Sequence, residues 1–417
     1  MAAALWAGPP AHRRPTPIAE RYRAGALGVL AAATAPENSV ERIAVPPRPD
    51  WREKVEGLGL VWHTASGAPY WNEAAYYAFT LEQISRIEAA TRELYRLFVQ
   101  AGEYIVDKRL YDRFAIPEWC WPLIDEAWKT EPPALNYGRF DLGFDGTGAP
   151  KLFEFNCDTP TSLVEAAVIQ WAWKEEVFPE QDQFNSLHDK LVAKWRDLLP
   201  YLAQGPVHFA HADEPTGEDA VTTAYLMDTA RAAGLQPQRL LISDLGWNGQ
   251  AFLDLNNAEI ATLYKLYPWE WLVNEPFGRN LVENRNRTVW IEPIWKMIWS
   301  NKAILPILWD LNPRHENLLW ATRDRPASDS YVKKPILARE GANVSLVKDG
   351  REIASTDGAY SDAPQVYQGL YELPSFDGQR PVVGSWVVDG EPAGMGVRED
   401  GPITGNLSRF VPHIIHG

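Results

Sequence analysis

Apolar residues recur with a helical period in the segment 81–102, where Ile84, Ile87, Leu94 and Leu97 fall on one side. This spacing predicts an amphipathic helix with one buried face. Gly102 closes the segment, and glycine is a common residue at the end of a helix. We therefore expect this helix to stop at Gly102.

A second pattern, between residues 205 and 246, alternates short apolar runs with a helical segment. Val207–Ala210 and Leu240–Ile242 have the length of buried strands, and Ala220–Ala233 between them reads as a helix closed by Gly234. A strand, a helix and a strand in this order predict a βαβ unit and a parallel sheet. From Tyr331 onwards the chain is rich in short strands and in Gly, Pro and Asp turns. The fold class that follows is α+β / α/β.

The segment 137–156 has the two-residue period of a β-hairpin, with a turn at Asp145–Gly148. In its first arm Phe140, Leu142 and Phe144 share one face, and Arg139, Asp141 and Gly143 share the other. In its second arm Phe153 and Phe155 point one way, and Leu152, Glu154 and Asn156 point the other way. Pairing the aromatic faces places four polar residues together: Arg139, Asp141, Glu154 and Asn156.

A helix start is expected directly after the hairpin. Thr159 is a capping residue type, and Pro160 suits the first helical position. The helix would continue through Leu163, Ala167 and Trp171. Its N-terminus would then lie just beyond the polar face of the hairpin.

The polar face of the hairpin has the residue types that phosphoryl transfer requires. Mg²⁺ prefers oxygen ligands, and two carboxylates and an amide supply three, while phosphates and water complete the octahedron. An arginine on the same face can neutralise charge on a transferring phosphoryl group. The hairpin alone also allows a simpler interpretation, in which it is half-solvated and Arg139 pairs with Asp141 or Glu154.

Two lysines farther along the chain suit phosphate binding. Lys302, in SNKAILP, precedes an apolar helix, and Lys334, in YVKKPIL, lies at the end of a strand. The loop Arg339–Val344 follows, and its glycine would let backbone N–H groups approach a phosphate. Val366–Gln368 reads as the next strand. Each lysine alone could be a solvated surface residue, but with the hairpin they predict a nucleotide site.

The composition narrows the class of protein. The 417 residues correspond to two or three domains of ~150 residues, and the formal charge of −15 argues against a nucleic-acid partner or a membrane partner. Two cysteines, Cys120 and Cys157, exclude a disulfide scaffold and favour a cytoplasmic location. The 19 tryptophans are expected in a large aromatic core or, alternatively, as stacking platforms for a ring-bearing ligand. The absence of GxxxxGK[ST] and GxGxxG argues against a P-loop or a dinucleotide fold.

Beyond these patterns, the chain resembles the synthetase domain of glutathionylspermidine synthase and its shorter relatives, the acid–amine ligases. The resemblance runs from about Val40 to Ile415 and rests on motifs in the same order: GRFD, LFEFNCDTPTSLVEA, SNKAILP, VKKP with REGAN, VYQ and GVRED. It implies an ATP-grasp-like fold and an ATP- and Mg²⁺-dependent C–N ligase. A substrate carboxylate would take the γ-phosphate as an acyl phosphate, and an amine would displace the phosphate to give an amide. The implied partners are a small carboxylic acid and an amine.

The resemblance also implies roles for single residues. Arg139 corresponds to the family's catalytic, transition-state arginine, and the metal ligands are Asp141, Glu154 and Asn156. Lys302 and Lys334 correspond to lysines that hold ATP phosphates. The other positions implied in ATP binding are Glu340 and Gly341 in the glycine-rich loop, Gln368 in the nucleotide strand, Ile403 near the base, and Arg398. Thr159 and Asp219 occupy the positions implied for the acid substrate.

Three departures from the family concern the substrates. Asp219 is followed by Ala220, so one of two neighbouring carboxylates is missing in our alignment. Arg409 replaces an aspartate that meets the polyamine, and Leu266 replaces a threonine. Each lost charge-assisted hydrogen bond would cost ~1.5–3 kcal/mol. We therefore expect an amine other than spermidine.

Competing interpretations remain open at this level. A glycoside hydrolase would use Asp141 and Glu154 as its carboxylate pair, but it leaves the lysines without a role. A catalytically silent nucleotide-binding relative is the main alternative. A zinc site at His208 and His211 is disfavoured because His208 lies in a strand. Cys157 is expected to be a small packing residue.

The expected organisation has four parts. Residues 1–38, rich in proline and arginine, form a flexible N-terminal extension rather than a targeting sequence. Residues 39–204 form an N-terminal lobe with the metal-binding hairpin, 205–290 a βαβ pre-ATP-grasp lobe, and 291–417 an ATP-grasp lobe. The amidase domain of the bifunctional family enzyme is not expected in this chain. ATP would lie between the last lobe and the hairpin, and the loop 339–343 would become ordered on binding it.

Overall fold

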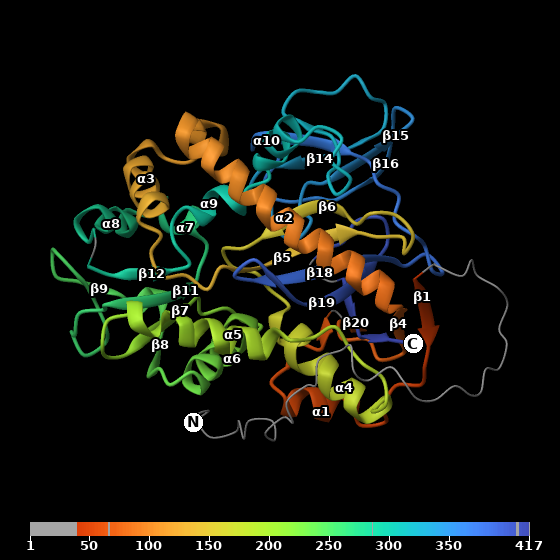
Figure 1. Ribbon diagram of the computed structural model, residues 1–417, viewed down its shortest axis with the longest axis horizontal. Coiled ribbons are helices and arrows are strands. Elements are labelled where there is room, and N and C mark those ends of the chain that lie inside the picture. The colour runs from red at the N-terminus through yellow and green to blue at the C-terminus, as the bar shows by residue number, and fades with distance from the viewer. Residues whose placement is uncertain (1–39, 66, 286, 406–407, 417) are drawn as a thin grey trace. The chain divides into compact units, whose positions relative to one another are not determined.

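The predicted hairpin is part of a five-stranded antiparallel sheet with the order β20-β19-β18-β5-β6 (Figure 1). The computed structural model describes residues 40–416 apart from 66, 286 and 406–407. The expected extension 1–38 lies outside the described residues. The strands of this sheet are β5 (Tyr137–Gly143), β6 (Lys151–Asn156), β18 (Arg380–Val388), β19 (Glu391–Asp400) and β20 (Arg409–Val411).

The register of β5 and β6 confirms the predicted polar face. Arg139 lies opposite Asn156, and Asp141 lies opposite Glu154. The register shifts after Asp141, so that Leu142 pairs with Leu152 instead of with Phe153. Because a β-bulge inserts one extra residue, the side chains beyond it change faces. The expectation for Leu152 and Phe153 is therefore wrong: Leu152 is buried in the core, and Phe153 lines a cavity.

The apolar face of the hairpin packs against the long helix α2 (Leu81–Lys108), which crosses this sheet in Figure 1. The Phe98 ring lies 5.5 Å from that of Phe140 and 5.0 Å from that of Phe155. The helix does not stop at Gly102 as predicted. A Cβ at Gly102 would lie 2.4 Å from the Trp128 ring, so this glycine allows close packing rather than ending the helix.

The predicted βαβ unit is confirmed. Strands β7 (Val207–His211) and β8 (Pro237–Leu241) are parallel, and α6 (Glu218–Ala232) connects them. They belong to a parallel sheet in the order β12-β11-β7-β8, completed by β11 (Thr262–Leu266) and β12 (Val289–Ile291). The apolar runs in the sequence explain this arrangement, because both the strands and the helix need a partner layer against which to bury their apolar faces.

The third large sheet contains the strands predicted near Lys334 and Gln368. Its order is β13-β17-β14-β15-β16, and all its strand pairs are antiparallel. The strands are β13 (Ala321–Thr322), β14 (Tyr331–Pro335), β15 (Ser345–Lys348), β16 (Arg351–Ser355) and β17 (Gln365–Gly369). The pairing of Val332 with Gln368 brings Lys334 and Gln368 near each other on adjacent strands.

The helix after the hairpin begins later than predicted. Thr159 and Pro160 lie in an irregular segment, and helical structure starts at Leu163. Ser162, just before it, has a left-handed backbone with φ of 65°. A π-helical turn (Glu165–Ile169) and α4 (Gln170–Val177) follow. The Thr159 side chain is therefore free to face the cavity described below instead of capping a helix.

The remaining strands and helices surround these sheets. The strands are β1 (Glu41–Ala44), β2 (Thr64–Ala65), β3 (Ala68–Pro69), β4 (Ala75–Phe79), β9 (Gly246–Trp247), β10 (Phe252–Leu253) and β21 (His413–Ile415). The helices are α1 (Trp51–Gly57), α3 (Trp121–Thr130), α5 (Leu187–Leu198), α7 (Trp269–Leu272), α8 (Asn280–Glu283), α9 (Lys296–Trp299) and α10 (Ile304–Leu311).

The architecture also concerns the expected division into lobes and the question of a membrane-spanning helix. The hairpin pairs with β18, so strands from the middle and the last thirds of the chain share one sheet. The division into lobes at 204 and 290 stays a prediction. Within the described part of the chain, no helix combines the length and the apolar character needed to cross a membrane.

Candidate functional site

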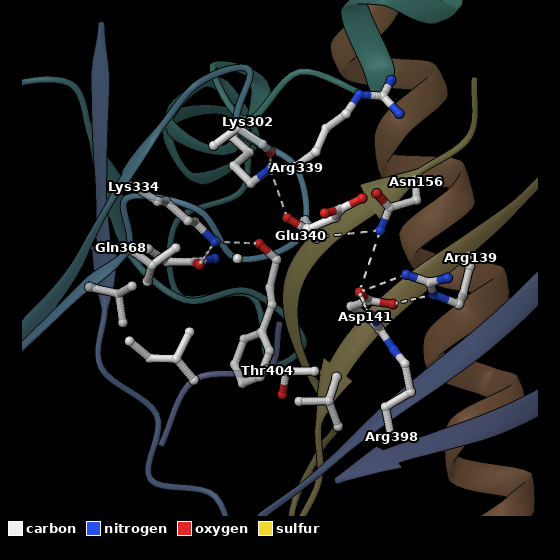
Figure 2. Close-up of a pocket in the computed structure, with 18 of the residues that line it drawn as sticks. Arg139, Asp141, Asn156, Lys302, Lys334, Arg339, Glu340, Gln368, Arg398 and Thr404 are labelled. Carbon is white, nitrogen blue, oxygen red and sulfur yellow. Dashed lines mark hydrogen bonds and ion pairs between the residues drawn. The ribbon is translucent and has the colours of Figure 1, made fainter. Parts of the chain in front are cut away.

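A cavity of about 330 Å³ opens between the polar face of the hairpin and the sheet that contains β14 and β17 (Figure 2). Segments around residues 337–341 and 402–404 complete its walls. All predicted site residues except Asp219 line this cavity: Arg139, Asp141, Glu154, Asn156, Thr159, Lys302, Lys334, Glu340, Gly341, Gln368, Arg398 and Ile403. Residues from six separate motifs thus converge on one site.

Asp141 lies between two arginines (Figure 2). Arg139 donates from Nε to Oδ1 at 2.6 Å and from Nη2 to Oδ2 at 3.1 Å. Arg398 donates from Nη2 to Oδ2 at 2.8 Å. Although burial opposes the charge on Arg139, Asp141 raises its pKa above the usual value. Burial and the neighbouring Arg139 lower the pKa of Arg398. Two guanidinium groups on one carboxylate leave a net positive charge directed at the cavity.

Glu154 and two lysines form a second charged group. Lys302 Nζ lies 2.9 Å from Glu154 Oε2 and donates to the Ala338 carbonyl at 2.7 Å. Lys334 Nζ donates to the Phe153 carbonyl and to Gln368 Oε1, both at 2.8 Å. Burial alone would raise the pKa of Glu154, but Lys302 and Lys334 hold it well below its usual range. Burial lowers the pKa of Lys334 to about 7.

The three predicted metal ligands lie next to one another. Asn156 Nδ2 is 3.1 Å from Glu154 Oε1 and 3.4 Å from Asp141 Oδ2. Among the residues that the structure describes, no group of three or more His, Cys, Asp and Glu side chains is arranged to hold a metal ion. Two carboxylates and an amide nevertheless fit Mg²⁺, because this ion commonly takes its other ligands from substrate phosphates and water. Arg139 and Arg398 pair with Asp141, and Lys302 pairs with Glu154. If a metal ion took the carboxylates as ligands, these cations would pair with the phosphates instead.

The glycine loop is held against the C-terminal segment. Gly341 has φ of 69°, and a Cβ there would lie 2.5 Å from the Thr404 carbonyl oxygen. Only glycine avoids both the backbone strain and the steric clash. Apolar side chains of Val332, Leu346 and Ile403 also line the cavity, and Val332 and Leu346 are paired on neighbouring strands. This wall has the apolar character that a planar base requires.

Arg339 is a cavity residue whose contacts the sequence analysis did not identify. Its Nη2 lies 2.7 Å from Glu270 Oε1, and its Nη1 donates to Thr159 Oγ1 at 3.0 Å. The guanidinium also lies 5.3 Å from the centroid of the Trp271 ring. Arg339 thereby connects the glycine loop to α7 and to the segment after the hairpin. Its position in the loop was the only signal in the sequence, since Glu270 comes from a distant segment.

Two neighbouring carboxylates stand at the start of α6, and one of them lines the cavity. Glu218, directly before Asp219, lines the cavity, whereas Asp219 does not. The assignment of Asp219 to the acid substrate stays a prediction. Burial, Glu165 and Asp219 raise the pKa of Glu218 to about 8. Burial and Glu214 raise the pKa of Asp219 to about 6.

The other two departures lie away from the cavity walls. Arg409 Nη2 is 3.1 Å from Glu399 Oε1, in a buried network that also includes Arg42 and Tyr77. Leu266 is buried in β11. Neither residue lines the cavity. The expectation of an amine other than spermidine stays a prediction.

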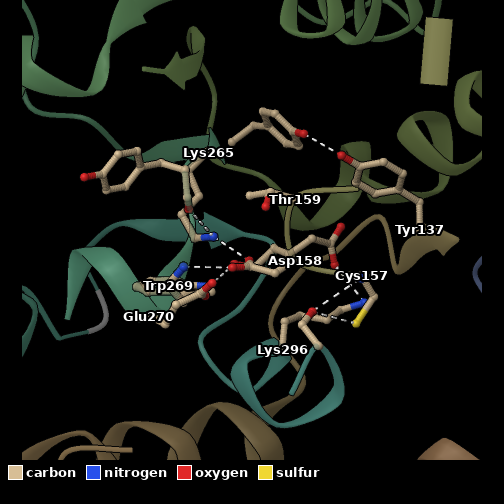
Figure 3. A network of polar contacts seen from close by, with 12 residues as sticks. Tyr137, Cys157, Asp158, Thr159, Lys265, Trp269, Glu270 and Lys296 are labelled. Carbon is tan, nitrogen blue, oxygen red and sulfur yellow. Dashed lines mark hydrogen bonds and ion pairs between the residues drawn. The ribbon is translucent and has the colours of Figure 1, made fainter. Parts of the chain in front are cut away.

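Asp158, which also lines the cavity, is held in a polar network (Figure 3). Lys265 Nζ is 2.6 Å from Asp158 Oδ1, and the Trp269 backbone N–H donates to Asp158 Oδ2 at 2.8 Å. Cys157, next to Asp158, is buried, and burial raises the pKa of its thiol to about 12. A neutral, enclosed thiol agrees with the predicted packing role of Cys157.

Solved structures of similar fold define the class of protein. A glutathione synthetase-like effector from Globodera pallida superposes with a TM-score of 0.54 over 88% of this chain and 95% of its own, at 10% sequence identity. This likeness concerns the fold alone. The protein is therefore a mixed α/β protein whose architecture is glutathione synthetase-like.

The sequence comparisons identify the family. Residues 42–416 match the family described as "Glutathionylspermidine synthase preATP-grasp". A protein of Haemophilus influenzae named "Putative acid–amine ligase" is 39% identical over 386 residues, which cover 88% of this chain and 97% of that protein. The chain belongs to the glutathionylspermidine synthase family.

Two longer relatives match over part of their length. Trypanothione synthetase of Crithidia fasciculata is 28% identical over 80% of this chain and 55% of its own length. The bifunctional glutathionylspermidine synthetase/amidase of Escherichia coli is 26% identical over 84% of this chain and 61% of its own length. The chain thus spans less than two thirds of these two synthetases.

Proposed function

We propose that the protein is an ATP- and Mg²⁺-dependent acid–amine ligase with an ATP-grasp-like nucleotide site, which forms an amide through an acyl phosphate. The observation that carries this proposal is the convergence of the hairpin carboxylates, two lysines and two arginines on one cavity. The names of the relatives agree with a ligase of small acids and amines. The identities of the acid and the amine are left open.

In this proposal Lys302 and Lys334 hold ATP phosphates, and Gln368 positions Lys334. The apolar wall with Ile403 receives the base, and the Gly341 loop covers the phosphates. Asp141, Glu154 and Asn156 would hold Mg²⁺, which neutralises phosphate charge when bound. Thr159 lies on the side of the acid substrate, where Arg339 fixes its hydroxyl.

Arg139 is proposed as the catalytic arginine. The substrate carboxylate oxygen attacks the γ-phosphorus, the bond to the ADP oxygen breaks, and an acyl phosphate forms. Charge develops on the equatorial phosphoryl oxygens in the transition state, where a fixed guanidinium stabilises it most. Asp141 and the Thr161 carbonyl, which accepts from Arg139 Nη1 at 2.5 Å, hold this guanidinium in place. The amine nitrogen then attacks the acyl carbon, and inorganic phosphate leaves with the electron pair of the broken C–O bond.

Trapping the acyl phosphate tests the proposal. Purified protein is incubated with Mg²⁺-ATP, hydroxylamine and a panel of carboxylic acids, and hydroxamate and ADP are measured together. We expect equal amounts of hydroxamate and ADP with at least one class of acid, and neither product without Mg²⁺. Tight Mg²⁺-ATP binding with no acid-dependent ADP across the panel would instead support a catalytically silent relative.

A further inference from the structure

Gly384 lies in the middle of β18, directly opposite Asp141 on β5. Its φ lies outside the left-handed region, so the backbone of this strand does not require glycine. Glycine in the interior of a strand weakens the strand and commonly marks a place where another group approaches closely. A Cβ at position 384 would lie 2.7 Å from Cδ of Arg139 and 3.3 Å from its Cγ and its Nε. The group that approaches is therefore the side chain of the proposed catalytic arginine.

The hydrogen bonds of Arg139 explain why its side chain lies against Gly384. Its Nε and Nη2 donate to Asp141, two residues farther along β5 on the same face. In the register of the sheet, Arg139 is opposite Trp386 and Asp141 is opposite Gly384. The guanidinium therefore turns along β5 toward Asp141, and the methylene groups that carry it lie over Gly384. A side chain at position 384 would occupy their space.

Trp386, two positions farther along β18, forms a second wall for this side chain. It is fully buried, and its ring centroid lies 5.9 Å from Arg139 Cζ, within the range of a cation–π contact. The ring stacks with that of Tyr137, with 6.4 Å between the centroids and 9° between the planes. The Tyr137 hydroxyl lies 2.6 Å from the Tyr264 hydroxyl, which holds the ring pair in place. One large residue and one missing side chain on β18 thus shape the space for Arg139.

The direction of the guanidinium matters because few of its donors are left. A guanidinium has five N–H groups. Among the described residues, Asp141 accepts from two of those on Arg139 and the Thr161 carbonyl accepts from a third. Two N–H groups remain for a ligand in the cavity that Arg139 lines. A small displacement of this group would therefore weaken its contact with a phosphoryl group.

We propose that Gly384 is a positioning residue for phosphoryl transfer, because its missing side chain leaves the space that directs the Arg139 guanidinium at the γ-phosphate. This inference rests on the proposed function, in which Arg139 stabilises the transition state. Gly384 does not itself line the cavity, so it acts through Arg139. Carbon atoms in contact are normally about 3.5–4.0 Å apart, and an alanine at position 384 would therefore displace Arg139 Cδ by about 1 Å.

Steady-state kinetics of Gly384→Ala measure the effect on the reaction. A displacement of about 1 Å in a catalytic group costs up to roughly 10² in rate, so we expect kcat to fall by about tenfold to a hundredfold. KM for ATP should stay within about threefold of the wild-type value, because Lys302 and Lys334 keep their places. Arg139→Ala lacks the Cγ and Cδ atoms, and adding Gly384→Ala to it should cause no further loss of kcat. Unchanged kcat in Gly384→Ala, or an equal proportional loss of kcat in both backgrounds, would overturn the proposal.

Urea unfolding of the wild type, the two single variants and the double variant tests the contact without any substrate. Gly384→Ala should lower the urea midpoint of the wild-type protein because its Cβ meets Arg139. In the Arg139→Ala protein it should leave the midpoint unchanged or raise it, since alanine is favoured over glycine inside a strand. If Gly384→Ala alone does not fold, recovery of folding in the double variant supports the proposal, and failure of the double variant to fold contradicts it.

Gly396→Ala is the matched control for this experiment. Gly396 lies opposite Gly384 on β19, but its Cβ would lie 2.5 Å from the ring of Phe410 instead of meeting Arg139. It should therefore lower the midpoint by the same amount with and without Arg139. Equal midpoint shifts for Gly384→Ala in both backgrounds would overturn the inference whatever the activity of the protein. A shift that depends on Arg139, together with no turnover on any acid, would support the placement of Arg139 by Gly384 and contradict only the proposed function.

Discussion

Two groups of buried ion pairs involve the hairpin and the segment directly after it. In the first, Asp141 pairs with Arg139 and Glu154 pairs with Lys302, and all four side chains line the cavity. In the second, Asp158 has both oxygens occupied by Lys265 and Trp269, and Lys265 Nζ also donates to the Tyr267 carbonyl. The first group is therefore available to a ligand, whereas the second is saturated. We infer that the first group serves function and the second holds the segment in place.

The largest expected effect on stability comes from breaking the ion pair between Asp158 and Lys265. Asp158→Ala leaves the Lys265 ammonium buried and unpaired, and we expect the free energy of unfolding to fall by about 3–5 kcal/mol. Burial already lowers the pKa of Lys265 and raises that of Asp158, so each charge depends on the other. Chemical denaturation measures the change. The double variant Asp158→Leu with Lys265→Met should recover most of the loss, and an unchanged midpoint in Asp158→Ala would contradict this view.

Substitutions in the first group, around Asp141 and Glu154, should change activity rather than stability. Arg139→Ala is expected to lower kcat by on the order of 10²–10³, by analogy with the loss of one transition-state donor. The fold should tolerate the change because Arg398 still pairs with Asp141. Phosphate release and thermal unfolding are measured side by side, with the exposed pair residue Arg96→Ala as the control. Normal turnover in Arg139→Ala would remove this residue from the mechanism.

A smaller effect should appear in the pH dependence of nucleotide binding. The Lys334 pKa of about 7 means that its amine is mostly neutral at pH 8 in the free protein. Bound phosphates favour the ammonium and raise this pKa, so binding at pH 8 should take up close to one proton. Affinity should then fall by at most about tenfold per pH unit above pH 7. Calorimetry in two buffers with different ionisation enthalpies measures the uptake.

The Lys334→Met variant serves as the control for proton uptake. It keeps a similar shape but has no titrating group, so the enthalpy should no longer depend on the buffer. Below pH 7 the wild-type protein should also lose this dependence, because Lys334 is then protonated before binding. Identical buffer dependence in both proteins at pH 8 would show that another group takes up the proton.

Much of the site could be predicted from local patterns. The two-residue period placed Arg139, Asp141, Glu154 and Asn156 on one face, and the register of β5 and β6 confirmed it. Strand pairing is strongly constrained where one face is aromatic and buried, which explains this success. The helix limits were less accurate. Gly102 has the residue type of a helix end, but tertiary packing against Trp128 overrides that local preference.

Contacts between distant segments were beyond the reach of the sequence. The β-bulge after Asp141 moved Phe153 to the cavity side, and no local pattern announces such an insertion. The link from Arg339 to Glu270 spans 69 positions, and Glu165 accepts hydrogen bonds from Trp62 and Tyr70, which lie 103 and 95 positions away. Alternation thus predicted the main elements and the polar face, and the order of the motifs indicated the family resemblance. Only the tertiary structure decided which charges are open to a ligand and which are closed, because that depends on what each side chain meets across the fold.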